Sequence, residues 1–220
     1  LGVKSGETVA ILSRSRYEWT LADFAIFGCA AISVPIYPSS TPDEIIHLIN
    51  HSGAKVAFVE DETQLAKILP RLEMMPNLEK IILFEASRAG LPAKAISLFD
   101  LQKNGESERR GTPNLFEETM LGLRAGDLFT IAYTSGTTGV PKGAMLTYEN
   151  LMSVLGDCAK AFGEHIREGR EVLLTFLPFS HIIGRLESMS TFVFGWQLAF
   201  NESPDKISED LREVRPTILF

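Results

Sequence analysis

The sequence is poor in cysteine and has no apolar run long enough to cross a lipid bilayer. Its two cysteines, Cys29 and Cys158, belong to no CxxC pair, which argues against a disulfide framework or a zinc site and favours a reducing compartment. The longest near-apolar stretch, residues 24–36, is shorter than the roughly 20 residues that a spanning helix needs. Because no signal peptide is recognisable either, we expect a cytoplasmic protein whose membrane contact, if any, is peripheral.

An excess of basic residues is missing as well. Lys and Arg total 21 against 28 Asp and Glu, so the formal net charge is −7. Nucleic-acid binding depends on a basic surface, so we expect no nucleic-acid partner, although a local basic pocket for a phosphate stays open. With 45% hydrophobic and 22% charged residues in 220, the chain has the composition of a globular protein rather than a disordered, collagen-like or coiled-coil one.

Strand-like and helix-like segments alternate along the chain. Apolar runs at residues 8–12 and 55–59 lack the polar alternation of a half-exposed strand, which is typical of strands covered on both faces. One helix has a clear start, with Thr41 as N-cap, Pro42 at the first position and Glu44 completing a capping box. Strands separated by helices predict βαβ units, so we expect an α/β fold of mainly parallel sheets flanked by helices.

The polar segment 102–114, QKNGESERRGTPN, is the strongest candidate for a boundary. It predicts a linker loop between two βαβ-type halves, residues 1–101 and 115–220, although a long loop within one domain is the alternative. The chain begins without Met, and its last residues, 217–220, have the pattern of a strand that is just beginning. Both ends look cut, so we expect a fragment of a longer protein.

One segment, from Tyr133 to Gly143, reads YTSGTTGVPKG and has the composition of a phosphate-binding loop. Glycines allow close approach of the backbone to a ligand, backbone N–H groups between them form an anion nest, and Lys142 adds a point charge. It is not a Walker A loop, because Lys142 lies between Pro141 and Gly143. The alternative is a flexible Gly/Thr linker. The hydroxyl and glycine residues concerned are Thr134, Ser135, Gly136, Thr137, Thr138 and Gly139.

The segment YTSGTTGVPKG resembles the signature loop of the adenylate-forming superfamily, which contains acyl-CoA synthetases, adenylation domains and luciferases. The continuation AMLTYENL at 144–151 and the stretch LPFSHIIGR at 177–185 are similar to that family too, as are GETVAI at 6–11 and VPIYP at 34–38. The Arg that follows His closely at 181–185, and the ending SPDKISEDLREVRPTILF, resemble most the long-chain fatty acid branch. The resemblance covers essentially the whole chain and implies the large N-terminal domain of such an enzyme.

The resemblance implies a ligase that works in two half-reactions. The carboxylate of a fatty acid attacks the α-phosphorus of ATP to give an acyl-adenylate and pyrophosphate, and the thiol of coenzyme A then displaces AMP. It also implies roles for site residues. The catalytic candidates are Lys142 and Thr134, and Thr134 is a candidate ligand of Mg²⁺ through its hard hydroxyl oxygen. The nucleotide would contact Thr134, Ser135, Gly136, Thr137, Thr138, Gly139 and Lys142, and the acyl substrate would contact His181 and Arg185.

Two other functions remain open from the sequence. A fatty-acyl-AMP ligase would pass its acyl group to the phosphopantetheine arm of a carrier protein, and a non-catalytic nucleotide-binding module would keep the fold without the reaction. The later motifs of the family, which hold adenine, ribose and the lysine of the small domain, would lie beyond residue 220. We therefore expect the 220-residue chain alone to bind nucleotide weakly and to catalyse nothing. The acyl chain length, the pathway and the oligomeric state are not determined by the sequence.

Overall fold

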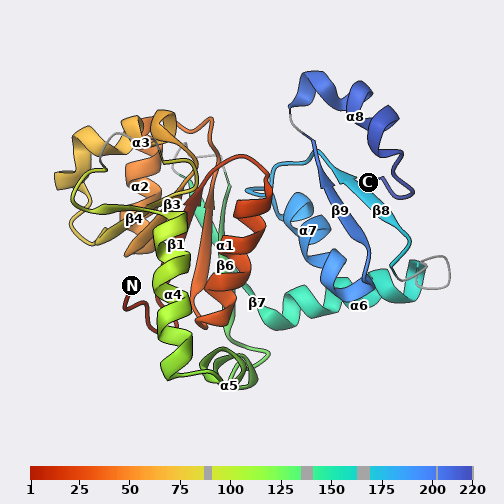
Figure 1. Cartoon of the computed structure of the whole chain (residues 1–220), viewed down its shortest axis with the longest axis horizontal. Coiled ribbons are helices and arrows are strands. Elements are labelled where there is room, and N and C mark those ends of the chain that lie inside the picture. The colour runs from red at the N-terminus through yellow and green to blue at the C-terminus, as the bar shows by residue number, and fades with distance from the viewer. Residues whose placement is uncertain (87–90, 135–140, 163–168, 202, 220) are drawn as a thin grey trace.

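Seven strands form one sheet in the order β5-β4-β3-β1-β2-β6-β7 (Figure 1). The computed structural model describes residues 1–220 except 87–90, 135–140, 163–168, 202 and 220. Every neighbouring pair in this sheet is parallel except β6 and β7, which are antiparallel, so the predicted mainly parallel sheet is confirmed. The strands are β1 (Thr8–Leu12), β2 (Ile32–Ile36), β3 (Val56–Val59), β4 (Lys80–Leu83), β5 (Ala95–Ser97), β6 (Leu128–Thr134) and β7 (Lys142–Thr147).

Helices cover both faces of this sheet. On one face, α2 (Pro42–Ser52), α3 (Glu62–Ile68) and the 3-10 helix η1 (Leu69–Met74) pack against apolar side chains of β1 to β4. On the other face, α1 (Tyr17–Gly28) and α4 (Leu98–Gly111) do the same. Every residue of β1, β2 and β3 is buried, as the lack of alternation in their sequences predicts.

Local sequence explains where α2 begins and ends. The Thr41 hydroxyl accepts a hydrogen bond from the Glu44 backbone N–H at 3.3 Å, and the Glu44 carboxylate accepts one from the Thr41 N–H at 2.7 Å. The helix ends at Gly53, which adopts the left-handed conformation with φ of 71° that favours glycine. The capping box predicted from the sequence is therefore confirmed.

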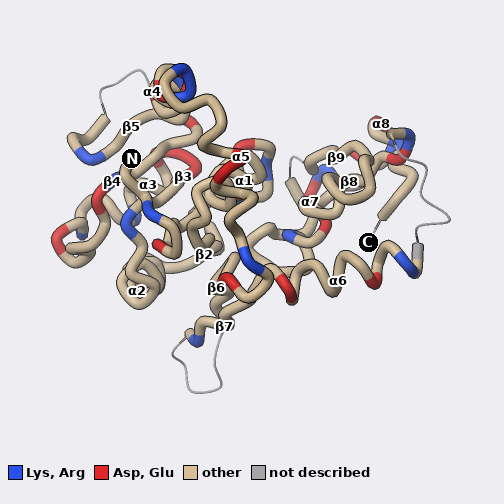
Figure 2. Tube along the Cα trace, turned by 90° about the horizontal axis from the view of Figure 1, so that it is seen from below, with Lys and Arg blue, Asp and Glu red and all other residues tan. Residues whose placement is uncertain are grey.

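A second, two-stranded parallel sheet lies in the C-terminal part, with β8 (Val172–Thr175) beside β9 (Gln197–Phe200). The helices here are α6 (Tyr148–Phe162), α7 (Ile182–Phe194) and α8 (Ile207–Val214), the last preceded by the 3-10 helix η3 (Pro204–Lys206). Figure 2 shows α6 extending from the end of β7 past α7. An apolar cluster that includes Phe27, Phe129, Leu155 and Met189 joins α1, β6, α6 and α7, so the two sheets share part of their core.

The linker loop predicted at 102–114 is wrong for most of its length, because α4 continues to Gly111 and α5 (Leu115–Leu121) follows shortly after. Ser97 caps α4 by accepting a hydrogen bond from the Asp100 N–H at 3.0 Å. Leu98 and Leu101 in the first turns pack against the sheet, so a helix that starts on the core continues into polar residues. None of the described helices combines the length and the apolar character that crossing a membrane requires.

Candidate functional site

The predicted phosphate-binding segment lies between β6 and β7. These two strands form an antiparallel pair in which Thr134, at the end of β6, lies opposite Lys142, at the start of β7. Both residues are exposed. The structure therefore brings a hydroxyl and an ammonium group to one edge of the sheet. The residues predicted between them, Ser135, Gly136, Thr137, Thr138 and Gly139, lie outside the described part of the chain.

The edge that carries Thr134 is the carboxyl edge of the parallel strands. β6 runs parallel to β2, and the Thr130 hydroxyl donates a hydrogen bond to the Ser33 carbonyl at 2.8 Å, which fixes their register. In open α/β sheets, ligands bind beyond the carboxyl ends of the strands. Thr134 and Lys142 thus lie at the carboxyl edge of the sheet, where open α/β folds bind their ligands.

The strand that leads to this segment is held by a contact that sequence reasoning missed. The Tyr133 hydroxyl lies 2.7 Å from Nδ1 of His51, which is in the last turn of α2. Burial raises the pKa of Tyr133. The ring of Tyr133 also packs over Gly143, where an added Cβ would come within 3.3 Å of the ring and 2.6 Å of Ile131 Cγ2. Glycine is therefore required at 143 for a packing reason. The sequence around His51 contains no pattern that would have predicted its contact with Tyr133, 82 residues away.

His181 is the residue immediately before α7. Its Nδ1 accepts a hydrogen bond from the Ile183 backbone N–H at 3.3 Å, and the backbone N–H of His181 donates to the Pro178 carbonyl at 2.9 Å. The imidazole is exposed and acts as the N-cap of the helix. The structure thus gives His181 a local role, and its predicted contact with an acyl substrate stays a prediction.

Arg185 lies in the interior, with a side-chain exposure of 1%. Its guanidinium donates hydrogen bonds to both carboxylate oxygens of Asp23 in α1, at 2.8 and 2.7 Å. The rings of Trp19, Phe27 and Phe129 surround it, with centroids 5.8, 5.4 and 4.9 Å from Cζ. This places Arg185 on the side of α7 that faces α1, in a buried ion pair with Asp23, and its predicted contact with an acyl substrate stays a prediction.

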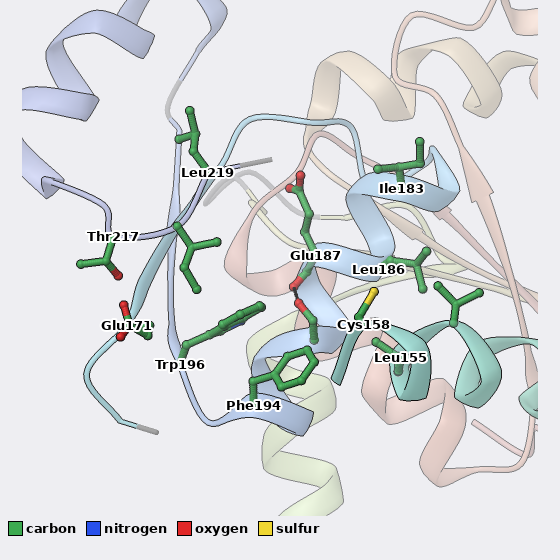
Figure 3. A pocket seen from close by; sticks show the side chains of 13 residues that line it. Leu155, Cys158, Glu171, Ile183, Leu186, Glu187, Phe194, Trp196, Thr217 and Leu219 are labelled. Carbon is green, nitrogen blue, oxygen red and sulfur yellow. Dashed lines mark hydrogen bonds between the residues drawn. The ribbon is translucent and has the colours of Figure 1, made fainter. Parts of the chain in front are cut away.

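A cavity of about 570 Å³ lies between α6, α7 and the second sheet (Figure 3). Its walls are mostly apolar, with Leu155 from α6, Leu186 and Phe194 from α7, and Trp196 just before β9. The volume falls in the range of small-molecule pockets, which are concave and lined mainly by hydrophobic and aromatic groups. The cavity can therefore take an apolar ligand or the apolar part of a larger one.

Glu187 brings a carboxyl group to this cavity. Its side chain comes from α7 and accepts a hydrogen bond from the Thr175 hydroxyl at 2.7 Å, where β8 ends. Burial raises the pKa of Glu187, and the Thr175 hydrogen bond opposes that shift only in part. Sequence reasoning did not single out Glu187, because a lone glutamate in a helix is more often a solvated residue.

A second cavity, of about 460 Å³, opens beyond the carboxyl ends of β1 and β3 and includes Arg14, Arg16 and Glu60 in its walls. Both arginines of this cavity form ion pairs with carboxylates. Arg14 Nε lies 2.7 Å from Glu60 Oε1, and Arg16 Nε lies 2.6 Å from Oε2 of Glu18. The arginines are thus already neutralised by carboxylates, which makes this cavity the weaker candidate.

The described part of the chain contains some of the protein groups that were predicted to hold a nucleotide and its Mg²⁺. Within the described residues, no three His, Cys, Asp or Glu side chains are grouped to hold a metal ion. The ammonium of Lys142 can nonetheless donate hydrogen bonds to phosphate oxygens, and the hydroxyl oxygen of Thr134 is of the type that ligates Mg²⁺. The donor chemistry fits a nucleotide with its magnesium, and the metal role of Thr134 stays a prediction.

Comparison with known proteins gives a consistent result over the whole chain. A family model described as AMP-binding enzyme matches residues 1–220. A long-chain-fatty-acid–CoA ligase of Mycobacterium bovis is 31% identical over 219 residues, covering 100% of this chain and 35% of the ligase. The peroxisomal long chain acyl-CoA synthetase 6 of Arabidopsis thaliana is 30% identical over 228 residues, covering 99% of this chain and 30% of the synthetase. The chain thus spans about a third of the length of the curated relatives it matches.

Solved structures share the fold. A long-chain-fatty-acid-CoA ligase from Archaeoglobus fulgidus superposes with a TM-score of 0.74 at 21% identity, covering 99% of this chain and 40% of that one. The N-terminal domain of FACL13 from Mycobacterium tuberculosis gives a TM-score of 0.71 at 20% identity, covering 99% and 50%. The arrangement of sheets and helices described above is therefore that of the N-terminal domains of adenylate-forming enzymes.

Proposed function

The chain belongs to the AMP-binding enzyme family, and from this premise we propose that the protein containing it activates long-chain fatty acids with ATP and transfers them to coenzyme A. The observation that carries the proposal is the segment from Tyr133 to Gly143, whose ends the β6–β7 pair holds together with Thr134 opposite Lys142. The long-chain-fatty-acid–CoA ligase of Mycobacterium bovis matches over 100% of the chain and the long chain acyl-CoA synthetase of Arabidopsis thaliana over 99%, which supports a long-chain acid as substrate.

The first half-reaction requires stabilisation of phosphate charge more than covalent help from the protein. When the acid carboxylate attacks the α-phosphorus, negative charge develops on the departing pyrophosphate. Lys142 would neutralise part of this charge, and Thr134 would donate its hydroxyl to a phosphate oxygen or hold Mg²⁺ through it. Bound Mg²⁺ would supply further charge neutralisation at the phosphates.

The apolar cavity supports a fatty acid as the second substrate. Burial of a hydrocarbon chain yields roughly 0.8 kcal/mol per CH₂ group, so an apolar cavity of about 570 Å³ favours long acids over acetate. His181 at the start of α7 and cavity-lining residues further along this helix belong to one element, which supports an acyl site along α7. Coenzyme A is the proposed acceptor in the second half-reaction.

Acid-dependent exchange between ATP and pyrophosphate tests this proposal. The complete gene product would be assayed with acids from acetate to oleate, beside the 220-residue chain. We expect exchange that rises with chain length in the complete protein and none from the chain alone. A folded complete protein that gives no exchange with any acid would contradict adenylation and favour a nucleotide-binding module. Exchange followed by transfer to a carrier protein, but not to coenzyme A, would favour the acyl-AMP ligase.

A further inference from the structure

Glu187 is one of four polar residues that line this mostly apolar cavity, with Glu171, Ser190 and Thr217, and it brings its carboxyl group from the middle of α7. The residue as a whole is 4% exposed, and it shares the cavity face of α7 with Ile183, Leu186 and Phe194. In Figure 3 its carboxyl group points away from Phe194 and Trp196, toward the space between Ile183 and Leu219. A carboxyl group in this position meets whatever occupies that part of the cavity.

The charge of Glu187 is not balanced by a cation within the described part of the chain, where its side chain forms no ion pair. Its one side-chain partner there is the Thr175 hydroxyl, which is bonded to Oε2. The nearest arginine along α7, Arg185, is already committed to Asp23 through two hydrogen bonds. Glu187 thus keeps hydrogen-bonding capacity that Thr175 does not use.

Burial without a cation favours the neutral form of a carboxyl group, and the pKa of Glu187 is raised accordingly. A neutral carboxylic acid both donates and accepts hydrogen bonds. A plain alkyl chain offers no partner for those groups, so its entry would remove water from the carboxyl without replacing the lost hydrogen bonds. A chain that carries a hydroxyl group would replace them.

We propose that Glu187 is a specificity-determining residue that selects aliphatic acids carrying a hydroxyl group on the chain over unsubstituted acids of the same length. This inference rests on the proposed function, because it assumes that the acyl chain enters the cavity between α6, α7 and the second sheet. It names a substrate class, hydroxylated long-chain acids, for that site. The hydroxyl would exchange hydrogen bonds with the free side of the Glu187 carboxyl.

The competing explanation is structural: the Glu187–Thr175 hydrogen bond could serve only to tie α7 to β8. The two explanations separate with matched variants. Glu187→Met replaces the carboxyl by an apolar side chain of similar length and removes the tie as well. Thr175→Val removes the same hydrogen bond but keeps the Glu187 carboxyl group, because Thr175 is a buried residue of β8 that does not itself line the cavity. Glu187→Gln keeps a polar group of the same shape.

The experiment is ATP–pyrophosphate exchange by the complete gene product with hexadecanoic acid and its monohydroxy derivatives, the hydroxyl being placed at successive positions. The readout is the ratio of kcat/KM for each hydroxy acid to kcat/KM for the plain acid. For wild type we expect a ratio above one at a restricted set of positions. Glu187→Met should lower that ratio about tenfold, the effect of one hydrogen bond, mainly by improving KM for the plain acid. Thr175→Val and Glu187→Gln should keep the ratio within about threefold.

Each outcome bears on a different claim. If wild type exchanges the plain acid well and prefers it at every hydroxyl position, the inference is overturned while the proposed function stands. The same holds if Glu187→Met is active and its ratio equals that of wild type. If wild type exchanges none of these acids, the proposed function itself fails. Should Glu187→Met not fold, the wild-type ratios alone decide the inference.

Discussion

The guanidinium of Arg185 and the carboxylate of Asp23 form a two-point ion pair with hydrogen bonds of 2.8 and 2.7 Å, although the residues are 162 positions apart. Neither side chain is more than 2% exposed. The pair joins α7 to α1 and so fixes the second part of the chain on the first. Because Arg185 faces α1, the opposite side of α7 is left to form the wall of the cavity.

Removal of Arg185 should be strongly destabilising. Arg185→Met leaves Asp23 buried without its cation, and breaking one side of a buried pair typically lowers the free energy of unfolding by about 3–5 kcal/mol. The double variant Asp23→Asn/Arg185→Met should lose less than the single variant, because no charge is then left unpaired. Urea unfolding of the four proteins in this cycle measures the coupling. Losses in the double variant that equal or exceed those of Arg185→Met would contradict the assignment.

Lys142→Ala should reduce exchange without affecting stability. Lys142 is exposed, so we expect its replacement to change the free energy of unfolding by less than about 0.5 kcal/mol. The loss of a charge that stabilises the departing pyrophosphate should lower the exchange rate by about 10²–10³-fold. Lys160→Ala, in the exposed Lys160–Asp157 pair of α6, is the matched control and should leave the rate unchanged. An active Lys142→Ala protein would remove the main support for the phosphate-binding assignment.

Gly143→Ala should destabilise the β6–β7 pair. The new Cβ would lie 2.6 Å from Ile131 Cγ2, so the Ile131 side chain or the backbone must shift, and such overpacking typically lowers stability by about 1–3 kcal/mol. Gly156→Ala, in α6, provides the control because nothing lies within 4 Å of its added Cβ. That change should stabilise the protein by about 0.4–1 kcal/mol through the unfolded state. Thermal unfolding of both variants tests the difference, and equal shifts in Tm would refute it.

Glu187 should make stability depend on pH. Because burial raises the pKa of Glu187, the folded protein holds this proton at pH values where the unfolded chain has lost it. The free energy of unfolding therefore falls as pH rises from the ordinary glutamate range through the raised pKa. Glu187→Gln has no such proton, so its stability relative to wild type should improve as pH increases. Urea unfolding between pH 5 and 8 measures this difference, and parallel profiles for the two proteins would contradict it.

Features set by neighbouring residues were predictable from the sequence. The capping box at Thr41 and Glu44 and the buried strand at residues 8–12 depend on local chemistry and short apolar runs, and the structure confirms them. The helix α4 was missed because its polar C-terminal half has no apolar periodicity of its own and continues a turn anchored by Leu98 and Leu101. Strand β7 was not predicted, because it lies at the sheet edge with mostly exposed or half-buried side chains and its first two residues belong to the predicted phosphate-binding loop.

Features that depend on distant partners were not predictable. The resemblance of the motif at 177–185 predicts that His181 and Arg185 contact the acyl substrate, but nothing in the motif indicates that Arg185 pairs with Asp23 in α1. The contact between Tyr133 and His51 likewise joins segments with no common pattern. The apolar cavity and the carboxyl of Glu187 within it arise only when α6, α7 and the second sheet come together. Such pairings depend on tertiary packing, which a single sequence does not display.

The most direct test of the proposed function is the product balance of the complete gene product with oleate, ATP and coenzyme A. We predict that each oleoyl thioester formed is accompanied by one AMP and one pyrophosphate, and that Lys142→Ala slows the formation of all three together. Release of ADP and phosphate with the thioester, or hydrolysis of ATP without any thioester, would contradict it.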